Sequence, residues 1–210
     1  MKFVIVFLAL AAMVSQKSPG IEQVRKDFGN LKTQGEARAY ISKTGLPGDI
    51  LELDQIRDSS AAALKLFKAS KGEVIEQQAG DKTYLYKAVT TIEADADRVQ
   101  YIYFDNSKVK KGKIDSLRAV ILKRISNGES FAALAKQYSM DPNGKRGGDL
   151  GWYDPAMFVR DFVNAVRAHK KDDVFTVDVP ANKWYYVVRK THNTIKRKKI
   201  IAAYIAVPSK

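Results

Sequence analysis

The chain has 210 residues, enough for one large domain or two small ones, and 45% of them are hydrophobic, an ordinary share for a protein with a buried core. It contains no cysteine, which excludes disulfides, thiolate metal sites, cysteine nucleophiles and lipid-modified cysteine anchors. The formal net charge of +13 leaves three kinds of partner open: nucleic acid, an anionic envelope surface and acidic polypeptides.

The first fifteen residues have the pattern of a secretory signal peptide. Met1 and Lys2 precede an apolar run from Phe3 to Val14, which is too short to span a bilayer but suits the hydrophobic region of a signal. We therefore expect residues 1–15 to be a signal peptide and the protein to be periplasmic or otherwise extracytoplasmic. Export makes nucleic acid the poorest of the three partners, and we expect none.

Residues 16–96 are predicted to form a helical segment followed by a β-hairpin. The stretch 21–69 is polar and helix-prone and predicts two or three helices. From 74 to 92, β-branched and aromatic residues alternate around a turn at 79–82, as in a hairpin. Residues 93–97 are then expected to be a short acidic link.

Residues 97–191 give a regular succession of strands and helices. Alternation predicts a first strand at 99–104 with Tyr101 and Tyr103 on one face. A helix ending at Gly128 and a second helix capped by Ser130 follow. The remaining elements are a strand at 149–153, a helix at 158–168 and a hairpin formed by 174–179 and 184–189. This order predicts an α+β domain with a mostly antiparallel sheet.

Two pairs of segments resemble each other. KGEVIEQQAGDKTYLYKAV, starting at Lys71, resembles KDDVFTVDVPANKWYYVVRK, starting at Lys171. RVQYIYFDNSK, starting at Arg98, resembles IIAAYIAVPSK, starting at Ile200. We infer a partial repeat, in which residues 61–92 echo the second half of a domain and residues 200–210 echo the first strand of another.

Residues 192–210 are predicted to form a basic C-terminal strand and tail. The four basic residues at 196–199 are expected to be a solvated edge that resists aggregation, with contact to an anionic envelope surface left open. The strand at 199–207 is expected either to complete a neighbouring sheet or to pair with a second copy of the chain.

The segment from Ser130, SFAALAKQYSMDPNGKRGGDLGWYDPAMFVRDF, has the most specific pattern in the sequence. It combines a short amphipathic helix, a polar loop, a GGDLG run followed by an aromatic residue, a methionine-containing turn and Phe162. This combination resembles the parvulin (rotamase) family of peptidyl-prolyl cis-trans isomerases found in exported bacterial folding factors, over residues 97–191. The resemblance implies a parvulin-like antiparallel four-stranded sheet with surrounding helices in the order β-α-α-β-α-β-β.

The resemblance also implies an isomerase acting on X-Pro bonds of unfolded exported proteins, without cofactor or metal. Rotation about such a bond faces a barrier of about 20 kcal/mol, so a catalyst needs an apolar seat for proline and a polar environment for the twisted amide. By resemblance, Leu150, Met157, Phe158 and Phe162 form the seat. Asp141 matches the position where parvulins carry cysteine or aspartate, although an aspartate at the start of such a loop is also a common turn-former.

The chain departs from the family pattern at two histidines. The first-strand histidine aligns with Tyr101 and the last-strand histidine with Tyr186, while His169 and His192 fall elsewhere. Tyrosine hydroxyls both donate and accept hydrogen bonds, so Tyr101 and Tyr186 are expected to act with Asp141 in polarising or orienting the amide. Two functions remain open: an isomerase, and a non-catalytic parvulin-fold chaperone that binds extended polypeptides.

Overall fold

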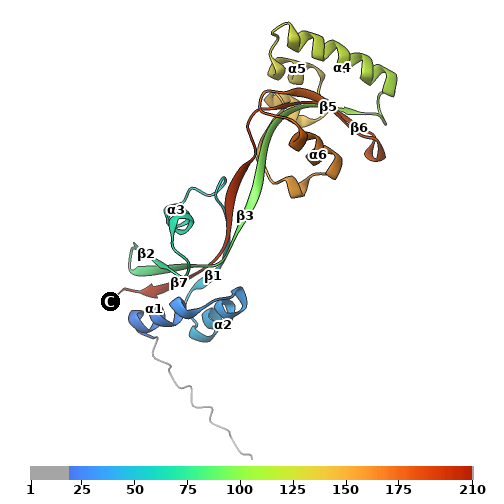
Figure 1. Cartoon of the computed structure of the whole chain (residues 1–210). Helices are drawn as coiled ribbons and strands as arrows, with labels where there is room; N and C mark the ends of the chain where they lie inside the picture. The colour runs from blue at the N-terminus through green and yellow to red at the C-terminus, as the bar shows by residue number, and fades with distance from the viewer. Residues whose placement is uncertain (1–18, 210) are drawn as a thin grey trace, which may run out of the picture. The chain divides into compact units, whose positions relative to one another are not determined.

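The computed structural model describes residues 19–209 and divides the chain into two compact units (Figure 1). The first unit contains the described residues up to 53, residues 60–90 and those from 200 onward, and the second contains 54–59 and 91–199. The predicted signal peptide lies outside the described residues. None of the helices between residues 19 and 209 is long and apolar enough to cross a membrane.

This division differs from the boundaries expected from the sequence. Strand β3 (Lys82–Asp105) is continuous, so the predicted acidic link at 93–97 is wrong. The predicted C-terminal segment 192–210 is also divided, because residues from 200 onward belong to the first unit and 192–199 to the second. Burial does not alternate through the charged stretch, where residues 90–93 are all exposed and Ala96 and Asp97 are both buried.

The first unit contains a four-stranded sheet in the order β2-β3-β7-β1. The predicted hairpin is confirmed, since β2 pairs antiparallel with β3 and Ala79 lies opposite Lys82. Strand β1 was not predicted. The elements are α1 (Ile21–Asn30), α2 (Gln34–Thr44), β1 (Gly48–Asp54), α3 (Ala61–Lys68), β2 (Val74–Ala79), the first part of β3 and most of β7 (Ile195–Pro208).

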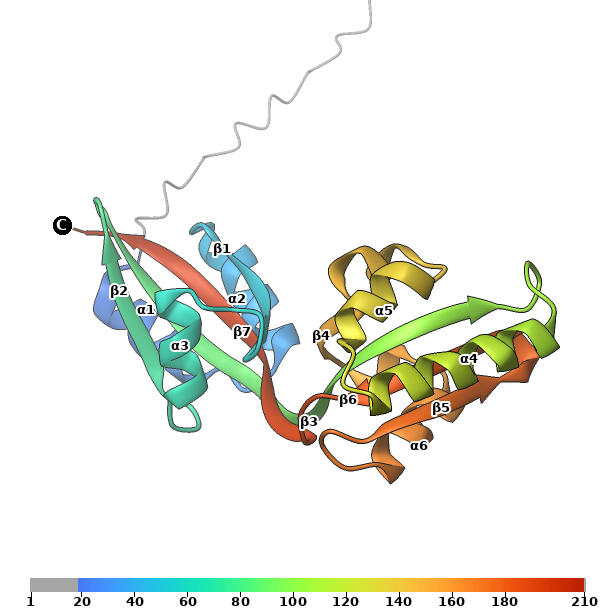
Figure 2. The same ribbon diagram turned by 90° about the horizontal axis from the view of Figure 1, so that it is seen from above.

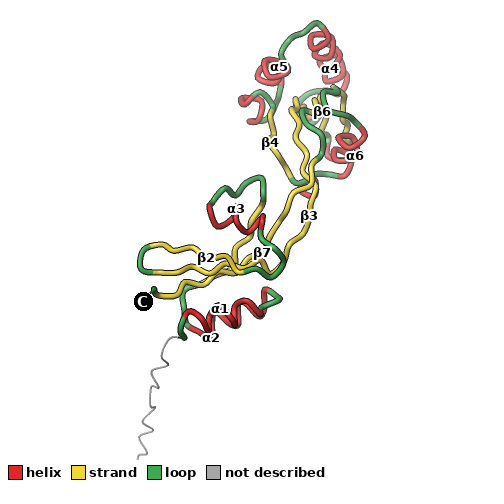
Figure 3. The backbone as a smooth tube through the Cα atoms, turned by 60° about the vertical axis from the view of Figure 1, so that its left-hand side comes forward, coloured by secondary structure: helices red, strands yellow, loops and turns green. Residues whose placement is uncertain are grey.

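Helices cover both faces of this first sheet (Figure 3). Alternate residues of β7 point to opposite sides: Ala203 and Ile205 pack with α1 and α2, whereas Ile200 and Ala202 pack with α3. Because β7 lies between β1 and β3, the strand predicted at 199–207 completes the sheet of the first unit, which was one of its two expected roles. It has no free edge for a second copy of the chain, so the other expected role was wrong.

The second unit contains an antiparallel four-stranded sheet in the order β4-β3-β6-β5, which confirms the predicted fold class. Its elements are the second part of β3, α4 (Lys111–Ser126), α5 (Phe131–Tyr138), the 3-10 helix η1 (Pro142–Arg146), β4 (Asp149–Tyr153), η2 (Pro155–Met157), α6 (Arg160–Ala168), β5 (Val174–Val179), η3 (Pro180–Asn182) and β6 (Trp184–Lys190).

Helices α4 and α5 lie on one side of this second sheet and α6 on the other (Figure 2), and each face carries an apolar cluster. Ile102 and Phe104 pack against α4 and α5, while Tyr101 lies on the other face with Phe162 of α6. The period-2 alternation of β3 therefore separates a closed core from a face that carries aromatic hydroxyls. Ser130 occupies the N-cap position of α5, but its side chain makes no capping hydrogen bond, contrary to expectation.

The two sheets have corresponding strand orders. From edge to edge, the first sheet runs β2-β3-β7-β1 and the second runs β5-β6-β3-β4. Hairpin β2-β3 therefore corresponds to hairpin β5-β6. In the same way, β7 corresponds to the second part of β3, and β1 corresponds to β4. This correspondence supports the partial repeat inferred from the sequence, which stays a prediction.

Candidate active site

A pocket of about 380 Å³ opens on the α6 face of the second unit's sheet, within the usual size range of ligand sites. Six of the seven predicted site residues line it; Leu150 does not, and packs instead, partly buried, against the apolar cluster of that face. The lining residues are Tyr101, Tyr103, Asp141, Met157, Phe158, Val159, Phe162, Trp184 and Tyr186.

The apolar wall of the pocket comes from η2 and α6. Phe162 is only 2% exposed, because the amphipathic α6 turns it toward the sheet. Phe158 stacks on Phe162 with ring centroids 5.6 Å apart and contacts Tyr153 at 4.5 Å. Met157, in contrast, is 72% exposed at the rim. Phe158 therefore fills the wall, and Met157 extends it toward solvent.

Three tyrosines from β3 and β6 form the opposite side. Tyr103 lies directly opposite Tyr186 in the antiparallel register, with ring centroids 5.4 Å apart. Tyr101, two residues earlier on the same strand face, meets Tyr186 edge to face at 5.8 Å and Phe162 at 6.5 Å. Tyr101 and Tyr186, the two tyrosines expected to act with Asp141, are thus in ring contact.

Asp141 joins the tyrosines to the loop after α5. Its Oδ2 accepts a hydrogen bond from the Tyr101 hydroxyl at 2.6 Å, and its Oδ1 accepts one from Ser139 Oγ at 2.8 Å. Oδ1 also accepts from the Gly144 amide at 3.3 Å and so caps η1. Asp141 therefore lines the pocket and forms the local turn at the same time.

Glycine is required where this loop meets β3. Gly148 has φ +77°, and a Cβ there would lie 2.4 Å from the carbonyl oxygen of Tyr101. The Gly148 carbonyl accepts a hydrogen bond from the Tyr101 amide at 3.0 Å. This close approach fixes the loop that carries Asp141 against the strand that carries Tyr101.

The pocket raises the pKa of each of its three tyrosines. Burial is the main cause for Tyr101, and its hydrogen bond to Asp141 adds to it. Burial is also the main cause for Tyr186 and Tyr103. The charges of Tyr103 and Asp141 raise the pKa of Tyr186 further, and those of Asp105 and Asp141 raise the pKa of Tyr103. All three hydroxyls therefore keep their protons at neutral pH. Tyr101 already donates its proton to Asp141, which leaves Tyr103 and Tyr186 as potential donors to a ligand.

Three residues that line the pocket and one supporting hydroxyl were not predicted as site residues. Tyr103 and Trp184 lie two residues from Tyr101 and Tyr186 on the same strand faces, so strand alternation could have placed them. Val159 directly follows Phe158. Ser139 had no recognisable signal, because its role depends on the chain turning back toward Asp141.

The two histidines lie away from the pocket. His169, at the C-cap of α6, stacks on Phe175 at 3.7 Å, and its Nδ1 lies 2.8 Å from the Ala165 carbonyl oxygen. His192 contacts Trp152 at 5.2 Å. Within residues 19–209, no group of three or more His, Cys, Asp or Glu side chains is arranged to hold a metal ion.

Comparison with known families gives a match over more than half of the chain. A family described as "PPIC-type PPIASE domain" matches residues 83–194. A putative peptidyl-prolyl cis-trans isomerase Cbf2 from Campylobacter jejuni is 30% identical over 131 residues, covering 54% of this chain and 48% of that protein. The chaperone SurA from Xylella fastidiosa is 29% identical over 196 residues, covering 87% of this chain and 37% of SurA.

The chain spans about half the length, or less, of these relatives. Among solved structures, a PpiC-type peptidyl-prolyl cis-trans isomerase domain is 20% identical with a TM-score of 0.43, covering 47% of this chain and 91% of that domain.

Proposed function

Because the chain belongs to the family of PPIC-type peptidyl-prolyl isomerase domains, we propose that it isomerises X-Pro bonds of unfolded exported proteins and so assists their folding. Relatives named foldase PrsA and chaperone SurA support this proposal. The observation that carries it is the pocket, in which an aromatic wall faces the hydroxyl–carboxylate pair of Tyr101 and Asp141.

The aromatic wall would bind the proline ring. Phe158 and Phe162 are stacked on each other, and Phe162 meets Tyr186 edge to face, an aromatic arrangement suited to a compact, apolar five-membered ring. Binding there removes water from the amide nitrogen side of the X-Pro bond. Since no covalent bond is made or broken, holding the ring while the preceding carbonyl rotates is the main task of the site.

The polar side would favour the twisted amide over the planar one. Asp141 accepts the hydrogen bond of the Tyr101 hydroxyl. The Tyr186 hydroxyl keeps its proton and is left to donate a hydrogen bond to the rotating carbonyl oxygen of the substrate. Tyr101 and Tyr186 would thus do with hydroxyls what histidines do elsewhere in the family.

The whole protein is proposed to act outside the cytoplasm on extended, proline-containing polypeptides. The hydrophobic N-terminal segment and the relationship to PrsA and SurA support this placement. The net charge of +13 would favour acidic client chains and contact with an anionic envelope surface.

A second candidate is a chaperone of the same fold that binds clients without catalysis. It is favoured by Tyr101 and Tyr186, because both family histidines are replaced together. In that case the pocket would bind proline-containing segments without lowering the rotation barrier.

Refolding of a denatured protein whose slow phase is limited by prolyl isomerisation distinguishes the two candidates. The isomerase reading predicts that substoichiometric amounts of the chain accelerate the slow phase and that Asp141→Ala abolishes the acceleration. Suppression of aggregation at stoichiometric amounts, with an unchanged slow phase, would support the non-catalytic chaperone instead.

A further inference from the structure

Arg197 is a buried cation that the proposed reaction does not use. Its side chain is 1% exposed, whereas that of its neighbour Lys196 is 70% exposed. The sequence-based expectation that 196–199 is simply a solvated edge was therefore wrong for Arg197. Burying a charge is costly unless the charge is paired, so the groups that pair it indicate what it holds in place.

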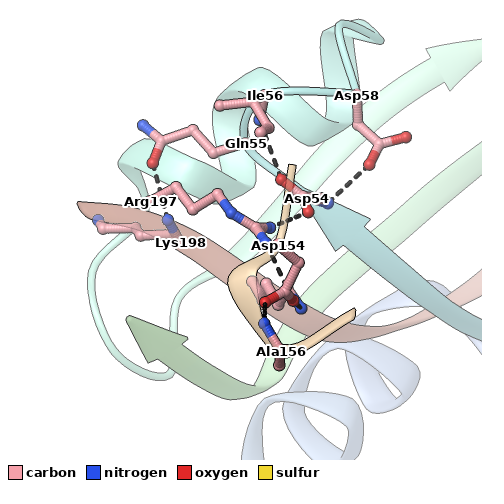
Figure 4. A network of polar contacts seen from close by, with 9 residues as sticks. Asp54, Gln55, Ile56, Asp58, Asp154, Ala156, Arg197 and Lys198 are labelled. Carbon is pink, nitrogen blue, oxygen red and sulfur yellow. Dashed lines mark hydrogen bonds and ion pairs between the residues drawn. The ribbon is translucent and has the colours of Figure 1, made fainter. Parts of the chain in front are cut away.

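Arg197 lies between two carboxylates, as Figure 4 shows. Its Nη1 donates a hydrogen bond to Asp54 Oδ2, and its Nη2 forms an ion pair with Asp154 Oδ2 at 3.1 Å. Lys199 also donates to Asp154 Oδ2. The guanidinium therefore hydrogen-bonds Asp54 through Nη1 and places its charge against Asp154 through Nη2, which makes no hydrogen bond of its own among the described residues. A planar guanidinium reaches both carboxylates at once, which a single ammonium group does not do equally well.

Asp154 caps the N-terminus of η2 with its other carboxylate oxygen. Its Oδ1 accepts a hydrogen bond from the Ala156 amide at 3.0 Å, and its carbonyl accepts from the Met157 amide at 3.0 Å. Burial alone would raise the pKa of Asp154, but Lys199, the Ala156 amide and the charge of Arg197 together hold it below its ordinary value. Asp154 is therefore a carboxylate at neutral pH, and its two oxygens join the cations to the turn.

The turn held by Asp154 carries one wall of the pocket. Met157 ends η2, and Phe158 follows it, with its amide donating to Pro155 at 3.1 Å. A single 3-10 turn has few hydrogen bonds of its own, so its position depends on its cap. Displacing the cap would move Met157 and Phe158, both of which line the pocket.

We propose that Arg197 is a positioning residue for the pocket: it fixes Asp154 and, through the turn that Asp154 caps, sets the placement of Met157 and Phe158 against the substrate. The inference rests on the proposed function, because the pocket is the proposed X-Pro site. Arg197 contacts neither the pocket nor, in this proposal, the substrate.

The first test compares Arg197→Gln with Lys196→Gln in the full chain. Both variants remove one positive charge from the same strand, but only Arg197 contacts Asp154. Arg197→Gln is expected to raise KM, or the Kd for an X-Pro peptide, about tenfold, with kcat changed much less, because the loss is in positioning the binding wall. Lys196→Gln is expected to stay within about twofold of the wild type.

The second test needs no peptide. Hydrogen exchange of the Ala156 amide reports directly on the bond to Asp154 and is expected to accelerate about tenfold or more in Arg197→Gln but not in Lys196→Gln. Should Arg197→Gln fail to fold, Arg197→Lys keeps the buried charge without the fork and is expected to show the same two effects in weaker form.

The outcomes separate this inference from the proposed function. Exchange at Ala156 and peptide affinity both within twofold of the wild type in a folded Arg197 variant would overturn the inference while leaving the proposed function intact. A wild-type chain that binds no X-Pro peptide would overturn the proposed function, and the inference about substrate positioning with it. If the wild type binds the peptide but the Ala156 amide exchanges as slowly in every Arg197 variant as in the wild type, the inference is overturned and the proposed function is not.

Discussion

The Tyr101 hydroxyl donates a hydrogen bond of 2.6 Å to Asp141, joining the first strand of the second unit to the loop that closes its pocket. The two residues are 40 positions apart in sequence and meet because Gly148 lets the loop pack directly on β3. In the proposed mechanism, this pair orients the polar side of the site while the aromatic wall holds proline.

Breaking the pair is expected to reduce catalysis more than stability. Tyr101→Phe keeps the ring contacts but removes the donor, and a net loss of about 1 kcal/mol in the free energy of unfolding is expected. Asp141→Asn keeps an acceptor near Tyr101 and serves as the matched variant. A double-mutant cycle on kcat/KM should show non-additive effects, whereas strictly additive effects would mean that the pair does not act as a unit.

Replacing Phe162 is expected to impair peptide binding specifically. Phe162→Leu should weaken the binding of an X-Pro peptide, because it removes one of two stacked rings from the wall. Phe104→Leu is the control, since Phe104 is equally buried, at 1% exposure, on the opposite face of the sheet. Both should cost roughly 1 kcal/mol of stability, measured by chemical denaturation. Equal loss of peptide affinity in both variants would contradict the assignment of the wall.

The activity is expected to be independent of pH between about 6 and 8. Burial raises the pKa of Tyr101 and Tyr186, so the hydroxyls stay protonated throughout this range, and the histidines lie outside the pocket. Isomerisation rates of an uncharged peptide, measured across that range, test this. A step in the rate within that range that disappears in His169→Gln or His192→Gln would contradict the assignment of the polar groups.

Stability is expected to fall in alkaline solution. Burial raises the pKa of Tyr186 above the ordinary tyrosine value of about 10, so the unfolded chain loses this proton first and the folded state is disfavoured as pH rises beyond about 10. The expected slope is up to about 1.4 kcal/mol per pH unit for this group. Tyr186→Phe should reduce the slope in denaturation experiments from pH 9 to about 11. An unchanged slope would show that this hydroxyl is not buried as described.

The approach of the loop to β3 can be tested at Gly148. Gly148→Ala is expected to destabilise the protein by roughly 2 kcal/mol or more, because φ is +77° and the added Cβ would meet backbone. Gly112→Ala is the control: nothing lies within 4 Å of its Cβ position in α4, and the change should be neutral or slightly stabilising. Equal melting temperatures for the two variants would contradict this account.

The second unit and most of its pocket could be predicted because their signals are local. Asp141, Met157, Phe158 and Phe162 lie within one short segment with a specific pattern, and strand alternation assigns the tyrosines to one face. Leu150 belonged to the same segment but turns into the cluster beneath the pocket, which depends on packing and not on spacing.

The remaining features depend on contacts between distant parts of the chain. Arg197 meets Asp54 across 143 positions, so nothing in the basic run around it indicated a buried ion pair. Strand β1 is short and lies in a polar, helix-prone stretch, and it is stabilised by pairing with β7 from the other end of the chain. Continuity of β3 was likewise hidden, because its charged middle looked like a linker.

The most direct measurement is magnetisation-exchange NMR of a short X-Pro peptide with the full chain, alongside Asp141→Ala and Phe162→Ala. The account predicts faster cis-trans exchange with the wild-type chain and loss of that acceleration in both variants. Unaccelerated exchange with the wild type, together with peptide-induced shifts at Phe158 and Tyr186, would contradict catalysis and identify a pocket that only binds.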